Sequence, residues 1–170
     1  MRIFFALWPD ADSRRELAGW ARRLQAVCGG TTIRSENLHL TLAFIGDVDI
    51  EQVAALRAAA ARVQARRFTL RLDQAGCWKH KRIIWAGADV VSVALSELVA
   101  DLRDSLAAAQ LPFDGQAFVP HVTLLREASA PVNWPELTPI TWTVGSYALV
   151  KSTSAERGVR YVVEALARLD

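Results

Sequence analysis

The stretch His39-Leu40-Thr41-Leu42 returns, with one conservative change, as His121-Val122-Thr123-Leu124. Only three histidines occur in the 170 residues, and two of them stand in this pattern. The chance that two of three histidines are followed in this way by threonine and leucine is on the order of one in ten thousand. The two copies begin 82 residues apart, close to half the chain, which is the spacing that a duplicated unit with pseudo-twofold symmetry would give.

Strand geometry turns this repeat into a candidate site. Residues i and i+2 of a strand point the same way, so Thr41 lies beside His39 on one polar face, and Thr123 beside His121. Two such strands brought together place two imidazoles across a gap, where one accepts a proton and the other donates one near neutral pH. The two hydroxyls can donate hydrogen bonds to the non-bridging oxygens of a phosphate. The motifs therefore predict a site suited to in-line attack on a phosphodiester.

A single His-x-Thr on a strand is more often a half-buried polar pair than a site, and it is the duplication that favours catalysis. Neither motif carries Asp or Glu on its polar face, and no group of carboxylates, histidines or thiols offers three ligands at metal-site spacing. We therefore expect no metal and no cofactor.

The composition sets the class of protein. Hydrophobic residues make up 52%, charged residues 22%, and the net charge is +2, which excludes a disordered or collagen-like chain. A chain of this length is expected to form one domain, 1–170, or two halves that share one cleft. No apolar run approaches the ~18 residues of a membrane span, and no signal peptide is visible. With only Cys28 and Cys77, we expect a cytoplasmic protein without an obligate protein partner.

Periodicity predicts mixed helices and strands, hence an α+β fold rather than a doubly wound parallel sheet. The strands are expected at 2–7, 38–45, 68–72, 82–86, 121–125, 141–150 and 159–165. The helices are expected at about 12–27, capped by Asp12 or Ser13, and at about 50–64 and 91–109. Segments 68–72 and 82–86 are expected to pair as a hairpin around a polar connection, and 151–154 to form a polar basic loop.

The motifs and their surroundings resemble the two-histidine (2H) phosphoesterase superfamily, whose signature is a pair of H-x-[ST]-Φ motifs. Within it, the similarity is to the bacterial RNA 2′,3′-cyclic phosphodiesterases, also called 2′-5′ RNA ligases. Asn37-Leu38 before the first motif and Pro120 before the second carry this closer similarity. The matching stretches span nearly the whole chain: Arg2–Ala6, Glu36–Leu42, Phe44–Val48, Pro120–Arg126, Tyr147–Ser152 and Gly158–Tyr161.

The resemblance implies two pseudo-symmetric α+β lobes with antiparallel sheets that face a central cleft, with helices on the outer faces. It implies metal-independent hydrolysis of a 3′-terminal 2′,3′-cyclic phosphate on RNA to a 2′-phosphate, with 2′-5′ RNA ligation as the reverse reaction. It also implies roles: His39 resembles the proton donor, His121 the proton acceptor, and Thr41 and Thr123 the phosphate-binding pair.

Further candidate substrate-binding residues surround this set. Phe4 is expected on the cleft face of its strand, where its ring could stack on a base. Arg126 closes the second motif strand and could reach a phosphate or stack on a base. Where the family often has a Glu-Ser pair, this chain has Lys151-Ser152, which we include as candidates. Arg157 and Arg160 could add to a positive rim.

The run Lys79-His80-Lys81-Arg82, which follows Trp78, is the densest cationic patch. A solvated hairpin tip is the favoured interpretation, and a platform for an RNA 3′ end is the alternative. His80 has no threonine partner, so we expect it to be non-catalytic. The tryptophans are expected mostly as core residues.

Three functions remain open from the sequence. The first is a cyclic phosphodiesterase that acts on RNA ends. The second is a 2H phosphoesterase for a small cyclic phosphate metabolite, which a lidded pocket rather than an open basic channel would favour. The third is a non-catalytic module that binds RNA ends and keeps the histidines as phosphate contacts, against which the two intact motifs argue.

Overall fold

The computed structural model describes residues 1–155 and 158–170, so Arg157 lies outside the described residues. The helices are α1 (Ala11–Cys28), α2 (Ile50–Ala60) and α3 (Val93–Ala108), with a short 3₁₀ turn at Ser35–Asn37. The strands are β1 (Arg2–Leu7), β2 (Thr31–Thr32), β3 (Leu40–Asp47), β4 (Phe68–Leu72), β5 (Gln74–Trp78), β6 (Ile83–Gly87), β7 (Val122–Arg126), β8 (Ile140–Val144), β9 (Ser146–Ala155) and β10 (Gly158–Arg168).

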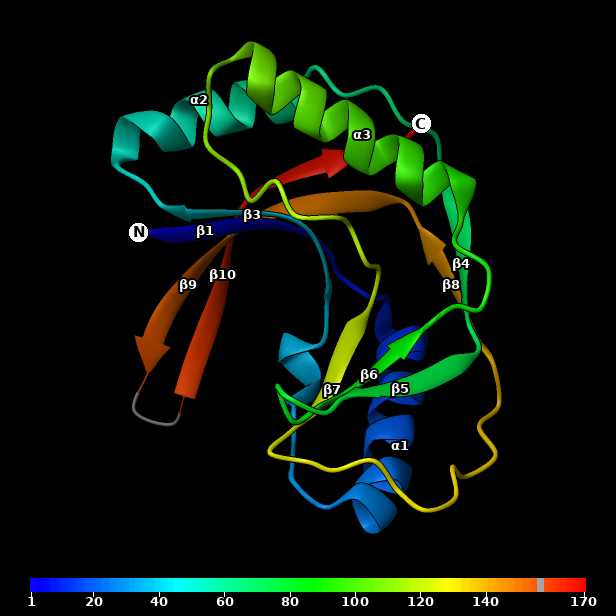
Figure 1. Cartoon of the computed structure of the whole chain (residues 1–170). Helices are drawn as coiled ribbons and strands as arrows, with labels where there is room; N and C mark the ends of the chain where they lie inside the picture. Colours follow the sequence, from blue (N-terminus) through cyan, green and yellow to red (C-terminus); the bar gives the residue numbers. More distant parts are fainter. Residues whose placement is uncertain (156–157) are drawn as a thin grey trace.

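The sheet divides the molecule into two lobes. Over the described ranges, eight strands form one antiparallel sheet in the order β10-β9-β1-β3-β7-β6-β5, with β2 beside β7, while β4 and β8 form a separate pair. Strands β3 and β7 meet at a single residue pair, Leu40 and Val122, and the two parts of the sheet diverge from there (Figure 1). The expected α+β class with two antiparallel lobes is confirmed, although one continuous sheet runs through both lobes.

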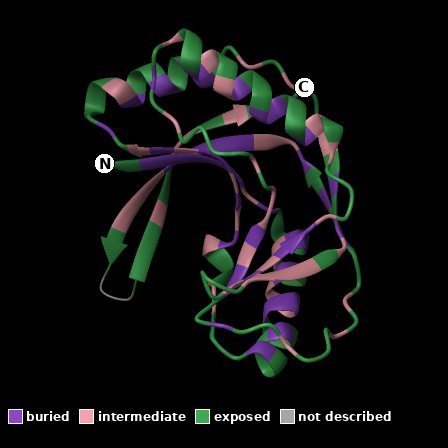
Figure 2. Cartoon of the chain, viewed as in Figure 1, coloured by how far each residue is buried: buried purple, intermediate pink, exposed green. Residues whose placement is uncertain are grey.

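Helices cover the outer side of each lobe. Helices α2 and α3 pack on each other above the β1-β3 lobe, and α1 packs against β7 and β8 (Figure 1). The alternation of β1 is as expected: Ile3, Phe5 and Leu7 are fully buried in the main core. Phe4 and Ala6 face the other way, into a smaller apolar cluster on the cleft side. Figure 2 shows that most of β1 is buried.

Strand β3 departs from the predicted alternation at its end. The sequence places Phe44 on the same face as Leu40 and Leu42. The register between β3 and β1 shifts twice. As a result, Phe44 lies opposite Phe4 and packs on the cleft-side cluster, while Ile45 is buried in the main core. The extra residues of the two bulges turn the side chains over, which simple alternation cannot anticipate.

The helix ends also differ from prediction. The side chain of Asp10, rather than Asp12 or Ser13, caps α1 by accepting the backbone N–H of Ser13 at 2.8 Å, and Ser13 itself is buried. Helix α2 ends at Ala60, four residues before the predicted end, and α3 starts after its cap Ser92.

The predicted pairing of 68–72 with 82–86 is wrong. Strand β4 pairs with β8 instead of with segment 82–86. Strand β6 pairs with β5, which lies in the segment predicted to be a polar connection. Strand β5 lies at one edge of the sheet and contains no Val, Ile or Thr, so the β-branched residues that mark a strand are missing from it. Residues 141–150 form two strands rather than one, and residues 151–154 lie inside β9 rather than in a loop.

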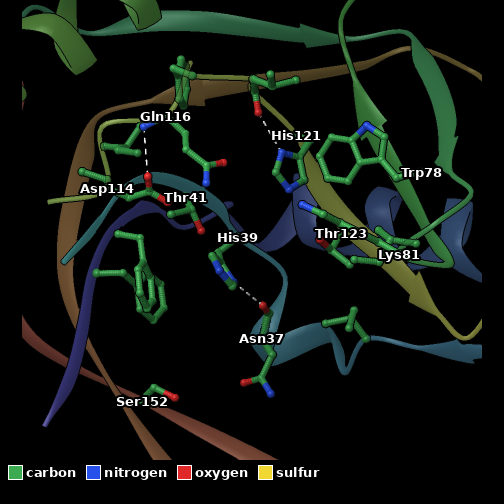
Figure 3. Close-up of a pocket in the computed structure, with 18 of the residues that line it drawn as sticks. Asn37, His39, Thr41, Trp78, Lys81, Asp114, Gln116, His121, Thr123 and Ser152 are labelled. Atoms are coloured by element: carbon green, nitrogen blue, oxygen red, sulfur yellow. Dashed lines mark hydrogen bonds between the residues drawn. The ribbon is translucent and has the colours of Figure 1, made fainter. Parts of the chain in front are cut away.

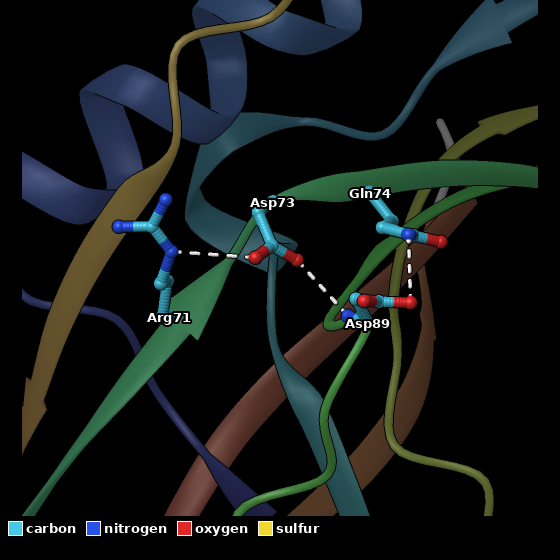
Figure 4. A network of polar contacts seen from close by, with 4 residues as sticks. All are labelled: Arg71, Asp73, Gln74 and Asp89. Carbon is cyan, nitrogen blue, oxygen red and sulfur yellow. Dashed lines mark hydrogen bonds and ion pairs between the residues drawn. The ribbon is translucent and has the colours of Figure 1, made fainter.

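A polar network holds the base of the β5–β6 hairpin (Figure 4). The carboxylate of Asp73 accepts the Asp89 backbone N–H at 2.9 Å and the Arg71 Nε at 3.3 Å. The Gln74 amide donates to Asp89 at 3.1 Å. These contacts tie the start of β5 to the loop that follows β6, so the hairpin that carries Trp78 is anchored at its far end.

Gly76 on β5 gives a test of the packing behind this hairpin. A Cβ atom there would overlap the indole of Trp85, which lies directly opposite on β6. We expect Gly76→Ala to lower the free energy of unfolding by about 1–3 kcal/mol, measured by denaturant titration, because overpacking forces the ring or the strand to move. Gly115→Ala, where a Cβ atom would meet nothing within 4 Å, is the control. Equal unfolding midpoints for the two variants would contradict this packing.

Candidate active site

Both motifs line one cleft of about 680 Å³ between the lobes (Figure 3). His39, Thr41, His121 and Thr123 all face it. Each histidine lies one residue before its strand, β3 or β7, instead of inside it as the sequence predicted. The antiparallel pair Leu40–Val122 aligns His39 with Thr123 and His121 with Thr41 across the strands. The duplicated motif therefore forms a nearly symmetric set of two imidazoles and two hydroxyls.

The two imidazoles are held in the same way. Nδ1 of His39 donates to the Asn37 carbonyl at 2.6 Å, and Nδ1 of His121 donates to the Val119 carbonyl at 2.8 Å. A carbonyl oxygen only accepts, so each Nδ1 carries the hydrogen and each Nε2 is left for the cleft. Such a ring accepts a proton at Nε2 when neutral and donates one from Nε2 when charged.

Aromatic rings surround His39. Trp8 stacks on it, with ring centroids 5.0 Å apart and planes 9° from parallel. The Phe4 centroid lies 5.1 Å away, and Tyr161 meets the imidazole edge-on at 5.1 Å. These contacts fix the plane of the imidazole, and the π face of the stacked Trp8 ring favours its charged form.

The surroundings of His121 differ. Trp78 meets its ring edge-on, with centroids 4.4 Å apart, and the Lys81 ammonium lies 5.4 Å from the centre of the same indole. His121 therefore has one aromatic neighbour and a nearby cation, where His39 has three aromatic rings.

The pKa values of both histidines are lowered. Burial is the main cause of the lowered pKa of His39, to which the charges of His121 and Arg126 add, while the hydrogen bond to Asn37 opposes them. Burial is also the main cause at His121, where Lys81 lowers the pKa further and the hydrogen bond to Val119 raises it. Both rings therefore favour the neutral form more than a free histidine does.

The other predicted residues are placed unequally. Phe4 lines the cleft but is only 4% exposed, because His39 and Tyr161 cover its ring, so little of it is left for a base. Arg126 and Ser152 line the cleft. Lys151 does not: it alternates with Val150 and Ser152 along β9 and lies opposite Ile3, on the far side of the sheet.

The cationic hairpin tip is closer to the site than predicted. His80 and Lys81 line the cleft, whereas Arg82 turns away and donates to the Glu127 carbonyl at 2.9 Å. Trp8 was expected in the core and was not among the predicted site residues. Trp78 was considered only with the cationic run, as part of the alternative platform for an RNA 3′ end. Trp8 could have been found, because it continues the alternation of Phe4 and Ala6 on the cleft face.

Within the described residues, no group of three or more His, Cys, Asp or Glu side chains is arranged to hold a metal ion. In the same part of the chain, none of the helices combines the length and apolar character needed to cross a membrane.

Comparison with known proteins agrees with this geometry. A family model described as LigT like Phosphoesterase matches residues 7–85. A protein of Escherichia coli strain K12 named RNA 2′,3′-cyclic phosphodiesterase is 35% identical over 162 residues, which cover 94% of this chain and 92% of that protein. The chain belongs to the LigT-like phosphoesterases. This confirms the resemblance drawn from the paired motifs.

Further LigT-like relatives match along most of their length. A Thermotoga maritima protein named RNA 2′,3′-cyclic phosphodiesterase is 28% identical, over 96% of this chain and 92% of that protein. The crystal structure of E. coli LigT complexed with 3′-AMP superimposes with a TM-score of 0.87 at 34% identity, covering 99% of this chain and 97% of that one. The two-lobed LigT-like fold is therefore shared along the whole chain.

Proposed function

We propose that this LigT-like phosphoesterase hydrolyses the 2′,3′-cyclic phosphate at the 3′ end of RNA to a 2′-phosphate. One observation carries the proposal: two imidazoles, each with Nδ1 bonded to a carbonyl and Nε2 left for the cleft, face one cavity together with two threonines. The names of the relatives, RNA 2′,3′-cyclic phosphodiesterase, supply the substrate class.

The residues present suffice for the reaction. Nε2 of neutral His121 takes a proton from water as the water oxygen forms a bond to phosphorus. The bond from phosphorus to the ribose O3′ breaks, and O3′ takes a proton from Nε2 of charged His39. The Thr41 and Thr123 hydroxyls donate to the non-bridging oxygens, where negative charge develops. The phosphate stays on O2′, and the two histidines exchange protonation states in each turnover.

Two features support this division of roles. The stacked Trp8 ring favours a charged His39, as an acid requires, and so opposes the burial and the His121 and Arg126 charges that lower the pKa of His39. The Lys81 ammonium disfavours a charged His121, as a base requires. Arg126, the last residue of β7, lines the cleft and supplies positive charge toward the phosphate. The same pair acting with a ribose 5′-hydroxyl in place of water would join two RNA ends by a 2′-5′ bond.

The test is turnover of a short RNA that ends in a 2′,3′-cyclic phosphate, with excess EDTA present. We expect conversion to the 2′-phosphate at the same rate with and without EDTA, because the acid, the base and the anion clamp are all side chains. If the product were instead the 3′-phosphate, the leaving oxygen would be O2′ and not O3′. Loss of activity in EDTA, restored by a divalent ion, would overturn the metal-independent mechanism, and binding without turnover would favour the RNA-binding module.

A further inference from the structure

A row of three polar side chains crosses the β1-β9-β10 part of the sheet. Arg2 lies directly opposite Ser152, and Ser152 lies directly opposite Tyr161. Directly opposed residues of antiparallel strands point to the same face, and all three line the cleft. We call these residues the Arg2–Ser152–Tyr161 row.

The donors of this row have no polar partner among residues 1–155 and 158–170. Within the described residues, no hydrogen bond or ion pair engages the Arg2 guanidinium or the hydroxyls of Ser152 and Tyr161. The nearest carboxylate along the strands is Asp47, opposite Arg2 on β3, and it instead lies 3.8 Å from the N-terminal ammonium. Arg2 is held over the Phe44 ring, 5.1 Å from its centre, which leaves the guanidinium edges free to donate.

The row begins beside one motif and leads away from it. The Tyr161 ring lies 5.1 Å from His39, whereas Arg2 lies opposite Asp47, the last residue of β3, at the other end of that strand from His39. One guanidinium and two hydroxyls on a single face suit an anion. Because Arg2 lies at the far end of β3 from His39, this anion differs from the reacting phosphate. The 2′ and 3′ oxygens of the terminal ribose both belong to the cyclic phosphate, so a second phosphate can only lie on its 5′ side.

We propose that the Arg2–Ser152–Tyr161 row binds the phosphate on the 5′ side of the terminal ribose. This inference rests on the proposed function and narrows its substrate class. The preferred substrate carries a phosphate at that 5′ position, as an RNA chain does, and a nucleoside 2′,3′-cyclic phosphate without one is a poor substrate.

The test compares four substrates: adenosine 2′,3′-cyclic phosphate, its 5′-phosphorylated form, a diadenosine ending in the cyclic phosphate, and the same dinucleotide with an uncharged methylphosphonate linkage. We expect kcat/KM for the natural dinucleotide to exceed that for the nucleoside by about tenfold or more, as suits charge-assisted hydrogen bonds, and mainly through KM. The methylphosphonate should remove this advantage. The 5′-phosphorylated nucleotide shows whether a terminal phosphate serves as well as an internucleotide one.

Variants test whether the Arg2–Ser152–Tyr161 row causes the higher kcat/KM of the dinucleotide. Arg2→Gln should bring the ratio of kcat/KM between dinucleotide and nucleoside close to one, and Ser152→Ala should reduce it by less. Arg23→Gln, at an exposed position of α1 outside the cleft, should leave the ratio as in the wild type. The methylphosphonate comparison needs no variant, so it holds even if Arg2→Gln is poorly folded.

The outcomes separate this inference from the function on which it rests. Equal kcat/KM for nucleoside and dinucleotide, or an advantage that survives both the methylphosphonate and Arg2→Gln, would overturn the subsite and leave the hydrolase intact. If none of the substrates were hydrolysed, the proposed function would fall. Equilibrium binding of the dinucleotide against its methylphosphonate analogue would then still decide whether the row binds phosphate.

Discussion

Alanine in place of His39 or His121 is expected to lower kcat on a cyclic-phosphate RNA by roughly 10²- to 10⁴-fold, the usual contribution of a positioned acid or base. Without His121, the attacking water loses the base that takes its proton. Without His39, the leaving oxygen departs without a proton from the enzyme. The double variant should be little worse than the poorer single variant, because the two rings act as a unit.

His80→Ala is the matched control for these variants. His80 also lines the cleft, but it has no threonine partner and no ring contact like those of the other two histidines. This variant should keep most of the wild-type kcat. Circular dichroism and thermal unfolding of all variants would show that the fold survives. A folded His39→Ala or His121→Ala protein with near-wild-type kcat would disprove the paired mechanism.

Valine in place of Thr41 or Thr123 is expected to give the next largest loss. Each change removes one hydroxyl from the phosphate clamp at a cost of about 1–3 kcal/mol, or roughly 5- to 150-fold in kcat/KM. Valine keeps the shape and β-branching of threonine, so the strand should be undisturbed. Thr143→Val, on the exposed face of β8, is the control and should keep wild-type activity.

The pH profile distinguishes two roles for these threonines. An uncharged hydroxyl that holds phosphate should leave the pH dependence unchanged when it is removed. A shift of either limb in a Thr41→Val or Thr123→Val variant would mean instead that the threonine tunes the neighbouring histidine.

The catalytic pattern was readable from the sequence because it rests on short-range geometry. Each motif contains both its histidine and its threonine, two residues apart, so the two side chains share a face of the strand. The same alternation placed Phe4 on the cleft face. The same alternation could have placed Trp8 beside Phe4, had tryptophan not been assigned to the core by its usual burial.

Long-range pairing and irregular strands could not be predicted in this way. The pattern of 68–72 marks a strand but says nothing about its partner, which lies about 70 residues further along in β8. The bulges that turn Phe44 into the cleft leave no local signal. Lys151 was proposed from its place in a family motif. It lies directly opposite Ile3, whose side chain points into the main core, so the Lys151 side chain also points away from the cleft.

The pH dependence of kcat/KM on a cyclic-phosphate RNA tests the central claim most directly, because it follows the free enzyme's acid and base. Activity requires one ring neutral, which limits the rate at low pH, and the other charged, which limits it at high pH. Burial lowers the pKa of both histidines, so both limbs of the profile shift to lower pH. We therefore expect a bell-shaped profile with its maximum below about pH 6.5. The two apparent pKa values belong to the coupled pair rather than to either ring. A profile with a single limb, or with a maximum well above the ordinary histidine pKa, would contradict acid–base catalysis by His39 and His121.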